Sequence, residues 1–465
     1  MKLKHTVTRI EGHATITVVI DDKTKEIKSV NLHITEFRGF EQFMVGRHIN
    51  DAPIISTRIC GVCPTAHHMC ASKATDMYYR AEIPEPARKL RQLLNLGGMA
   101  ESHALHFFVL GAPDLVFGID APMEKRNILA IKKEHPDLFK KGFLLVKTGL
   151  SIIETVGGRK IHPICSVPGG VIKPLSASER ENLLNAVKES IPVAEEVVDF
   201  TIELMEKIDL SFGDLPTNYV ALTRDGFVEH YDGRIRVLQK DGKKFEFDDI
   251  KYNDYIEETS VDYSYAKYPY LKQLGFPEGL YRVGPMARLV VNDKFDTPKS
   301  NEFLKEFKKF FEKHPHVPLL YHLARVIELL YCLEKSKELL ESDDITSENT
   351  KVKLEKGYAG DAIGVVEAPR GLLIHHYKVD DDGIITWANL VVATVQNIPI
   401  MDKSLESIAK KYFGKASDDV LFNAMETLIR AYDPCISCAT HASNPYSLQI
   451  IFVNCEGEII KKIVR

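Results

Sequence analysis

The sequence of 465 residues lacks both long apolar runs and an excess of positive charge. It contains no run of about 18 apolar residues, the length that a membrane-spanning helix requires. Lysines and arginines number 60 against 65 aspartates and glutamates, so the net charge of −5 excludes a broadly basic surface for nucleic acid or anionic membrane. The N-terminus carries lysines but no apolar stretch follows, so we expect no signal peptide and a cytoplasmic protein.

Cysteines are also few, which excludes a disulfide scaffold. There are eight, and in a cytoplasmic protein paired cysteines favour metal or redox groups. Four of them form two Cys-x-x-Cys pairs near opposite ends of the chain, Cys60/Cys63 and Cys435/Cys438. Four thiolates from two distant segments can converge on one centre, and thiolates suit nickel, iron, zinc and copper(I).

The distance between the two pairs bears on the kind of metal site. A structural zinc site usually joins pairs that lie about 15–20 residues apart in one small module. The much longer separation here does not prevent a site, because each doubling of loop length costs only about 0.6 kcal/mol. It does require the whole fold to position the sulfurs, which favours a buried catalytic centre, with structural zinc as the alternative. A dithiol–disulfide function is less favoured, since neither pair lies in a thioredoxin-like strand–helix unit.

The distribution of apolar residues predicts a mainly helical protein with β additions. Stretches rich in β-branched and apolar residues predict strands at 14–20, 27–33, 357–380, 448–454 and 458–464. Apolar residues at helical spacing predict helices at 65–80, 86–110, 176–205, 318–330 and 402–432. Ser176 and Glu179 form the capping-box pattern at the start of the third helix. Residues 210–295, rich in Tyr, Asp and Gly, predict an irregular or β-containing insertion.

The residues around the cysteines form two of six motifs. The first pair lies in RICGVCP at 58–64, followed by His67, and the second pair lies in DPCISCATH at 433–441. The other four motifs are VTRIEGH at 7–13, FRGFE at 37–41, GGRKIHP at 157–163 and EAPRG at 367–371. In content and order, the six motifs resemble those of the large subunit of nickel–iron hydrogenases.

The resemblance implies a fold and a metal centre. The expected fold is mainly α with β additions (α+β), with long helices around a buried metal centre and residues 1–441 as a single large catalytic domain. Cys60 and Cys435 are then terminal nickel ligands. Cys63 and Cys438 bridge nickel to an iron that carries cyanide and carbon monoxide.

A magnesium ion is the second metal that the resemblance implies. Glu41 and His441 match the residues that hold it in the family. Carboxylate and water suit magnesium, whereas histidine is a ligand that the chemistry of this ion alone would not suggest.

Heterolytic cleavage of dihydrogen requires bases close to the metal. A terminal thiolate such as that of Cys435 can accept the first proton, because metal binding lowers the pKa of a thiol. The family motif makes Glu11 the expected proton relay, although without the motif it would be read as a solvent-exposed glutamate at a strand edge. The resemblance puts the guanidinium of Arg370 over the open metal face, supported by Asp114 and Asp433.

Further residues are expected around these ligands. By resemblance, His67 donates a hydrogen bond to a bridging sulfur. The segment at Pro369 and Arg370 is expected to hold the cyanides, with help from Thr394. His68 has no such support from a motif and is expected to pack. The histidines that match no motif are expected to be structural: His103, His106, His375 and His376.

The four remaining cysteines exclude one type of cofactor. Cys70, Cys165, Cys332 and Cys455 match no iron–sulfur spacing, so they predict ordinary packing and no cluster in this chain. Electrons released from hydrogen must therefore leave through another subunit. We expect an iron–sulfur small subunit, docked on a large apolar surface near the nickel-side motifs.

The resemblance also predicts processing of the C-terminus. Family members lose an extension just after the last motif, which here corresponds to cleavage between His441 and Ala442 by a maturation protease. Residues 442–465 would be removed, and Cys435 and Cys438 would then move onto the metal. The alternative is a protein that keeps its tail.

Within the family, the cysteine motifs look most like cytoplasmic archaeal hydrogenases that do not reduce the deazaflavin F420. Such enzymes imply two partners, which are a heterodisulfide reductase complex and a further electron-transfer subunit. The alternatives are an F420-reducing hydrogenase and a hydrogen-sensing regulator. A respiratory-complex homologue that lost the metal is disfavoured, because all four ligand cysteines are present.

Overall fold

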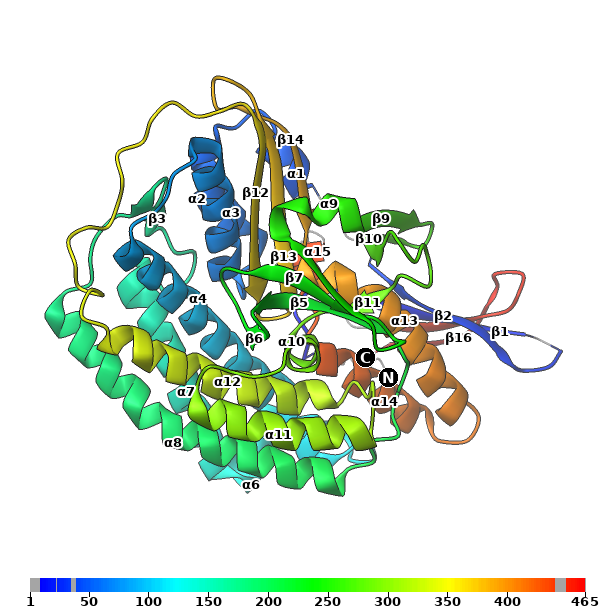
Figure 1. Ribbon diagram of the computed structural model, residues 1–465. Coiled ribbons are helices and arrows are strands. Elements are labelled where there is room, and N and C mark those ends of the chain that lie inside the picture. Colours follow the sequence, from blue (N-terminus) through cyan, green and yellow to red (C-terminus); the bar gives the residue numbers. More distant parts are fainter. Residues whose placement is uncertain (1–8, 22, 35–38, 440–448, 465) are drawn as a thin grey trace.

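The computed structural model of the chain describes residues 9–21, 23–34, 39–439 and 449–464. A layer of long helices packs beneath several small sheets (Figure 1). The long helices of this layer are α4 (Glu85–Leu105), α7 (Pro136–Gly157), α8 (Ala177–Lys207), α11 (Pro298–Lys313) and α12 (Leu320–Glu341). No helix within the described ranges is both long and apolar enough to cross a membrane.

Glycines allow α4 and α7 to pack at close range. A Cβ atom at Gly97 would lie 2.5 Å from the Ile152 side chain, and one at Gly149 would lie 2.6 Å from the Glu101 backbone nitrogen. A larger residue at either position would push the two helices apart. Glycine weakens an isolated helix, but here Gly97 and Gly149 allow the two helices to pack closely.

Most of the predicted helices are confirmed. Helix α8 begins with the predicted capping box, in which Ser176 and Glu179 exchange hydrogen bonds between side chain and backbone N–H. Helix α3 (Pro64–Tyr79) also agrees with its prediction, and α4 continues into a π-helical segment (His106–Gly111). The range 402–432 divides into α13 (Ala393–Tyr412) and α14 (Asp418–Tyr432), so α13 begins earlier than predicted. Helices α7 and α11 were not predicted from the sequence.

Three antiparallel strands form the sheet that carries the EAPRG motif. They are β12 (Gly360–Ala368), β13 (Gly371–Val379) and β14 (Ile385–Val391). Helix α3 lies against β12 so closely that a Cβ atom at Gly364 would lie 1.9 Å from the Cys70 carbonyl oxygen. The tight turn between β12 and β13 contains Pro369 and Arg370 and points toward the cysteine motifs.

The range 210–295 contains β structure, as predicted, the single-turn helix α9 (Tyr252–Tyr255) and one longer helix. Its main strands are β5 (Asn218–Arg224), β7 (Arg234–Leu238), β8 (Lys244–Asp248), β9 (Ile256–Val261) and β10 (Ser264–Leu271). The longer helix, α10 (Pro285–Val291), is buried between β5 and α12. The range is therefore an integrated part of the structure that places α10 close to the β12–β13 turn.

The terminal segments form one four-stranded sheet in the order β16-β15-β1-β2. The predicted strands at both ends are confirmed as β1 (Thr15–Ile20), β2 (Ile27–His33), β15 (Gln449–Val453) and β16 (Ile459–Val464). Strand β15 pairs in parallel with β1, so strands from the two ends of the sequence lie side by side (Figure 1). Phe452 of β15 is buried and stacks on Phe413.

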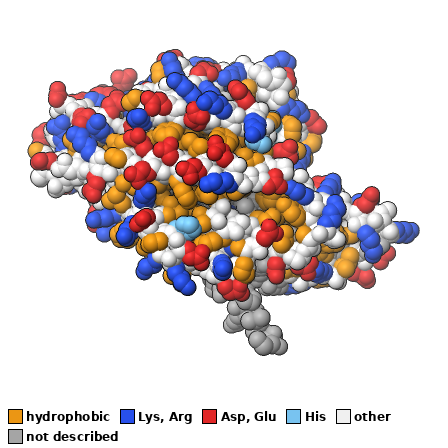
Figure 2. Space-filling model, turned by 90° about the horizontal axis from the view of Figure 1, so that it is seen from below, with side chains coloured by type: hydrophobic (Ala, Val, Ile, Leu, Met, Phe, Trp, Pro, Cys, Tyr) orange, Lys and Arg blue, Asp and Glu red, His pale blue; other side chains and the backbone are white. Residues whose placement is uncertain are grey.

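Short elements connect these parts. The short helices are α1 (Phe40–Met44), α2 (Ala52–Ile55), α5 (Ala112–Phe117), α6 (Ile128–Glu134), α9 (Tyr252–Tyr255) and α15 (Ile436–Ala439). The short strands are β3 (Ser166–Val167), β4 (Gly170–Val171), β6 (Phe227–Val228) and β11 (Tyr281–Arg282). On the face that Figure 2 shows, charged side chains of both signs are interspersed with hydrophobic ones, as the small net charge suggests.

Candidate metal centre

The two cysteine pairs meet in the interior. The Sγ atoms of Cys60 and Cys435 lie 3.1 Å apart, as do those of Cys63 and Cys438, and Cys435 and Cys438 are separated by 2.9 Å. All four sulfurs lie within 4.8 Å of one another, and all four residues are buried free thiols. The arrangement is a closed set of four soft donors.

Local structure aims each pair at this point. Cys63 is the N-cap of α3, where Pro64 occupies the first helical turn and needs no hydrogen-bond partner for its nitrogen. At the other pair, α14 ends at Asp433 in the left-handed conformation (φ 54°), and Pro434 prevents the helix from continuing. The backbone N–H of Cys435 then donates to Thr394 Oγ1 at 3.0 Å. Thr394 therefore anchors the second pair from the start of α13.

Arg370 supplies positive charge beside the sulfurs. Its Nε and Nη2 atoms donate to the backbone oxygen and to Oδ1 of Asp433 at 2.7 and 2.9 Å, and Nη1 donates to Ser102 Oγ at 3.3 Å. Burial disfavours its charge, but Asp433 and the cysteine thiolates more than offset this and raise the pKa of Arg370 well above its usual value. Hydrogen bonds from the neighbouring thiols, together with Arg370, lower the pKa of Cys60.

This donor set fits the implied metals. Four buried sulfurs, with a fixed guanidinium that favours thiolates, form a site for a soft metal ion such as nickel, iron or zinc. The geometry therefore confirms the predicted convergence of the two pairs. The sulfurs alone do not distinguish nickel and iron from zinc.

Glu11 lies against the second cysteine pair. Its side-chain oxygens accept hydrogen bonds from the hydroxyl and the backbone N–H of Ser437, the latter at 2.9 Å, and its backbone oxygen accepts from Ile436 N–H at 3.0 Å. Burial, with a contribution from Cys60, raises the pKa of the Glu11 carboxyl. Gly12 permits this approach, because its φ is 84° and a Cβ atom would lie 2.6 Å from Ile436. The carboxylate is thus a partly buried group beside the cysteines, in contrast to the solvent-exposed alternative.

His67 also contacts the cluster. Its Nε2 atom lies 3.6 Å from Cys438 Sγ, and its Nδ1 atom shares a hydrogen bond of 3.0 Å with Nε2 of His375. Nδ1 of His375 in turn bonds to the Tyr377 hydroxyl at 2.8 Å. The chain Tyr377–His375–His67 therefore orients the ring next to Cys438.

Two residues of this hydrogen-bond chain, His375 and Tyr377, were not predicted from the sequence to belong to the site. His375 was expected to be only structural, because it matches no motif. His375 and Tyr377 lie two positions apart on β13 and so share one face of the strand. This spacing is a signal that could have suggested a joint role. His68, as expected, supports packing, since it bonds to Pro53 and Ser166.

Asp114 does not contact Arg370, contrary to expectation. Among the described residues, its ion-pair partners are Arg9, Arg126 and Arg430. Although burial opposes its ionisation, the charges of these arginines lower the pKa of Asp114 well below the usual carboxyl value. Three guanidinium groups in the interior need this counter-charge, so Asp114 is committed to them and Asp433 alone is paired with Arg370.

Several expected residues lie outside the described part of the chain. They are Val7, Thr8, Phe37, Arg38, Thr440, His441 and Ala442. Of the two expected magnesium ligands, only Glu41 is described, and it lies in α1. The cysteines, in contrast, already converge while residues 449–464 form strands. Movement of Cys435 and Cys438 onto the metal after loss of residues 442–465 stays a prediction.

The other cysteines lie apart from this centre. Cys70, Cys165 and Cys332 are buried and Cys455 is exposed. Burial raises the pKa of Cys165 to about 12, which is typical of an inert packed thiol. Within the described ranges, the Cys60–Cys63–Cys435–Cys438 set is the only metal-compatible cluster of three or more such residues.

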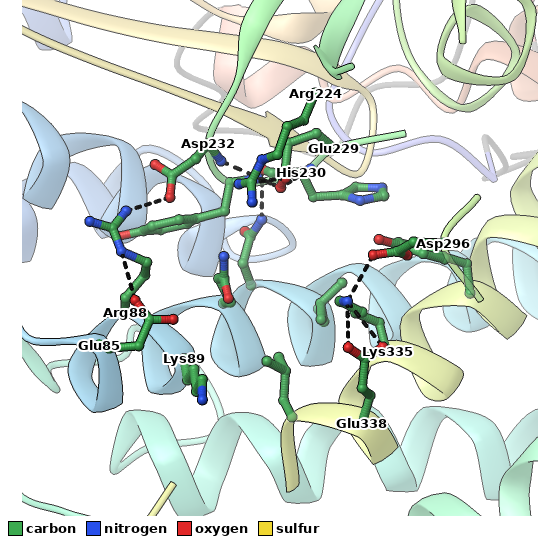
Figure 3. Close-up of a pocket in the computed structure, with 16 residues that line it drawn as sticks. Glu85, Arg88, Lys89, Arg224, Glu229, His230, Asp232, Asp296, Lys335 and Glu338 are labelled. Carbon is green, nitrogen blue, oxygen red and sulfur yellow. Dashed lines mark hydrogen bonds and ion pairs between the residues drawn. The ribbon is translucent and has the colours of Figure 1, made fainter. Parts of the chain in front are cut away.

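A polar cavity of about 570 Å³ lies away from the cysteines, between α4, α12 and residues 224–232 (Figure 3). Its charged side chains are paired across its walls. Arg88 bonds to Asp232 at 2.6 Å, and Lys335 bonds to Asp296 at 2.8 Å. The cavity also exposes an edge of His230. Its balanced charges do not indicate an anionic or a cationic ligand.

Comparison with known proteins places this site in a family. A family model described as nickel-dependent hydrogenase matches residues 38–130 and 232–441, and a model described as HoxL-like matches residues 5–37. An F420-non-reducing hydrogenase of Methanothermobacter thermautotrophicus contains a chain that is 43% identical over 98% of each sequence. The NAD-reducing hydrogenase HoxS subunit beta of Cupriavidus necator is 38% identical over 99% of this chain and 98% of the relative.

Solved structures agree with the sequence matches. The structure of an NAD+-reducing NiFe hydrogenase in the H2-reduced state has a TM-score of 0.90 at 38% identity, covering 94% of this chain and 98% of that chain. The Ni-Fe-Se hydrogenase of D. vulgaris Hildenborough has a TM-score of 0.75 at 26% identity, covering 93% of this chain and 98% of that chain. The predicted α+β fold is therefore confirmed.

Proposed function

Because the chain belongs to the nickel-dependent hydrogenase family, we propose that it is the catalytic large subunit that cleaves dihydrogen, reversibly, into protons and electrons. The observation that carries the proposal is the buried four-sulfur cluster formed by the family's two cysteine motifs. A nickel–iron centre with cyanide and carbon monoxide on iron, when bound, supplies the electrophile at which dihydrogen is split. The same cluster in a structural zinc protein would not need a carboxylate and a guanidinium beside it.

Four residues would hold the centre. Cys60 and Cys435 are the proposed terminal nickel ligands, and Cys63 and Cys438 the proposed bridging ligands. The short distances within each of these pairings are consistent with ligands of a common centre. The hydrogen bond from Cys435 N–H to Thr394 fixes the backbone of the second motif against the start of α13.

Proton movement is assigned to protein side chains. The Cys435 sulfur is the proposed first base, and Glu11 receives the proton next, since it lies against residues 435–437. A carboxyl group whose pKa is raised by burial is closer to neutral pH, and it can accept and release a proton more readily there. The bonds from Ser437 hold the carboxylate in place for this transfer.

Arg370 and His67 complete the proposed site. Arg370, paired with Asp433, would keep a positive charge over the open face and, with Pro369 and Thr394, would contact the iron-bound cyanides. His67 would donate a hydrogen bond to Cys438, a bridging sulfur, and so tune its basicity. Asp114 would act only indirectly, by holding the arginines around α5 and α14.

Electrons would leave through an iron–sulfur small subunit, because the remaining cysteines of this chain form no cluster site in the described ranges. The names of the relatives, which are single subunits of larger hydrogenases, support a multisubunit enzyme. Ile161 in the GGRKIHP motif is 53% exposed, and His162 bonds to the Thr57 backbone oxygen close to Cys60, which supports a docking surface near the nickel-side motif.

The functional class within the family is proposed from the F420-non-reducing relatives. It implies a cytoplasmic complex with a heterodisulfide reductase and a further electron-transfer subunit. An F420-reducing enzyme and a hydrogen-sensing regulator are the alternatives. Reduction of a viologen dye by hydrogen at enzymatic rates would exclude the sensor, and direct reduction of F420 by the purified complex would exclude the non-reducing class.

Maturation and magnesium remain part of the proposal. We expect a protease to cleave between His441 and Ala442, and magnesium to bind Glu41 and His441. The intact mass of active enzyme tests the first point, because a mass that includes all 465 residues would contradict cleavage. Glu41→Gln should lower the magnesium content of purified enzyme, and unchanged magnesium would remove Glu41 from the site.

Metal analysis tests the function itself. Purified enzyme should contain nickel and iron, show infrared bands of cyanide and carbon monoxide, and oxidise hydrogen with a viologen dye. Cys435→Ala should abolish turnover and nickel binding, while Cys165→Ala, at a cysteine outside the cluster, should leave both unchanged. Zinc without nickel in the wild-type enzyme would overturn the proposal.

A further inference from the structure

A second buried charge cluster lies behind the turn that carries Arg370. Its centre is Arg288 of α10, whose side chain is completely buried. Two nitrogens of its guanidinium bond to both oxygens of Glu328 in α12, and Nη1 donates to Glu367 Oε2 at 2.6 Å. A guanidinium held by two carboxylates in this way has little freedom to move.

The same guanidinium reaches the backbone of the turn. Nη1 of Arg288 donates to the Ala368 carbonyl oxygen at 3.1 Å, and Nη2 donates to the Pro369 carbonyl oxygen at 3.3 Å. Ala368 and Pro369 are the two residues directly before Arg370. Arg288 therefore binds one side of the turn from which the Arg370 side chain extends toward the cysteines.

The backbone of residues 283–284, directly before α10, packs against the other side of the turn. A Cβ atom at Gly284 would lie 2.8 Å from the Arg370 carbonyl oxygen, and one at Gly371 would lie 2.3 Å from the Val283 side chain. Both glycines have positive φ angles, 98° and 134°, that other residues rarely adopt. Residues 283–288 thus hold the backbone of the turn from two directions.

Glu328 is itself held in place. In addition to Arg288, it accepts hydrogen bonds from His103 Nε2 at 2.7 Å and from His230 Nε2 at 2.8 Å. His230 forms part of the wall of the polar cavity in Figure 3, so this network reaches from the cavity to the turn. Although burial opposes their charges, the charge of Arg288 lowers the pKa of Glu328, and Glu328 and Glu367 raise that of Arg288. The pair therefore stays ionised.

We propose that Arg288, fixed by Glu328, is a positioning residue that sets the direction of the Arg370 guanidinium over the four-cysteine site. This inference deepens the proposed function, because it concerns the residue assigned to the open metal face. Arg288 does not touch the cysteines and acts only through the turn. A shift of about 1 Å in a catalytic group can reduce a rate by about 10²-fold, so a loosened turn should have a large effect.

Arg288→Lys tests the hydrogen bonds of Arg288 to the β12–β13 turn, here called the Arg288 clamp, while it retains the positive charge. A lysine cannot form the fork of bonds to Glu328, Ala368 and Pro369 at once. In the metal-free chain, we expect the backbone amides around 370–372 to exchange with deuterium at least about tenfold faster than in wild type. In the loaded enzyme, we expect kcat with a viologen dye to fall by about 10- to 100-fold, with nickel content and the KM for hydrogen unchanged.

A buried pair elsewhere provides the matched control. Arg91 and Asp76 also form a buried ion pair with bonds to backbone oxygens, but these belong to Val167 and Gly170. Asp76→Asn should lower thermal stability without changing exchange around residues 370–372 or kcat. Glu328→Gln, which keeps the shape of the side chain, should have the same effects as Arg288→Lys but weaker. This variant tests the inference if Arg288→Lys does not fold.

Two results would overturn the inference. One is exchange around residues 370–372 that is as slow in Arg288→Lys and Glu328→Gln as in wild type. The other is an equal change in Asp76→Asn, which would show a general effect of breaking a buried pair. The exchange measurement needs no metal, so it tests the Arg288 clamp even if the wild-type enzyme does not oxidise hydrogen. Absence of hydrogen oxidation in the wild-type enzyme would count against the proposed function and not against the clamp.

Discussion

The backbone N–H of Ser437 donates to the carboxylate of Glu11 at 2.9 Å, across 426 positions of sequence. Ser437 lies between Cys435 and Cys438, so the bond joins the N-terminal motif directly to the last cysteine pair. A partly buried carboxylate is thereby held beside the second cysteine pair. This contact supports the proposal that Glu11 is the first side chain to receive a proton that leaves the cluster.

Replacement of Glu11 by glutamine tests this proton step. Glu11→Gln keeps a hydrogen-bond acceptor for Ser437 but cannot carry a proton, so we expect the exchange of D2 with water to slow by roughly 10²-fold or more. Nickel and iron content should be unchanged. Exchange is followed by mass spectrometry of the gas phase. Glu26→Gln, at an exposed glutamate, is the control, and a wild-type exchange rate in Glu11→Gln would remove Glu11 from the relay.

Replacement of Arg370 by lysine tests the need for a guanidinium. Lysine keeps the charge but cannot bond to both the backbone oxygen and Oδ1 of Asp433. We expect kcat to fall by roughly 10²-fold while the four cysteines still bind metal, and the cyanide infrared bands to shift. Arg91→Lys is the control for loss of a buried arginine. Unshifted bands together with a wild-type kcat would contradict the assignment.

The hydrogen-bond chain from Tyr377 through His375 to His67 predicts that replacing His375 lowers activity more than replacing its neighbour His376. His375→Gln removes the bond that orients His67, and we expect activity to fall by about tenfold. His376→Gln is a matched control, since this adjacent ring bonds to Tyr252 and Asp361 on the other face of the strand. Activity of the two variants is compared at equal nickel content. If His67→Gln and the His67→Gln/His375→Gln double variant are equally impaired, the two rings act as one unit.

Asp402 predicts a pH dependence of stability. It is 6% exposed and accepts bonds from Leu32 N–H and from the hydroxyls of Tyr263 and Tyr268. Burial raises its pKa from 3.8 to about 7. Between these values the folded chain binds more protons than the unfolded chain, so this group stabilises the fold below the window and its contribution is lost as the pH rises through about 7.

Asp402→Asn should remove this pH dependence. As the pH rises from 3.8 to about 7, the free energy of unfolding of wild type should fall by up to about 4 kcal/mol more than that of the variant. The measurement is the midpoint of urea unfolding of the metal-free chain at a series of pH values. Asp254→Asn, at an exposed aspartate, should follow the wild-type curve. Parallel curves for Asp402→Asn and wild type would contradict the prediction.

The sequence alone was sufficient for features that depend on short-range patterns. The cysteine motifs, the capping box of α8, helix α3 and the strands at both termini follow from local spacing and composition, and the structure confirms them. The start of α13 was missed because residues 393–401 are buried on all sides and therefore lack the polar face that marks a helix.

Tertiary structure alone decided which charges meet. Arg370 is paired with Asp433 and Asp114 with three other arginines, although both carboxylates were expected to support Arg370. The pairing of β15 with β1, the contact of His375 with His67 and the clamp of Arg288 on the β12–β13 turn likewise join segments far apart in the chain. Such contacts depend on how helices and sheets pack, whereas residue spacing reports only on neighbours within a few turns or strands. The sequence by itself thus determined the chemistry of the four sulfurs, and packing decided which side chains surround them.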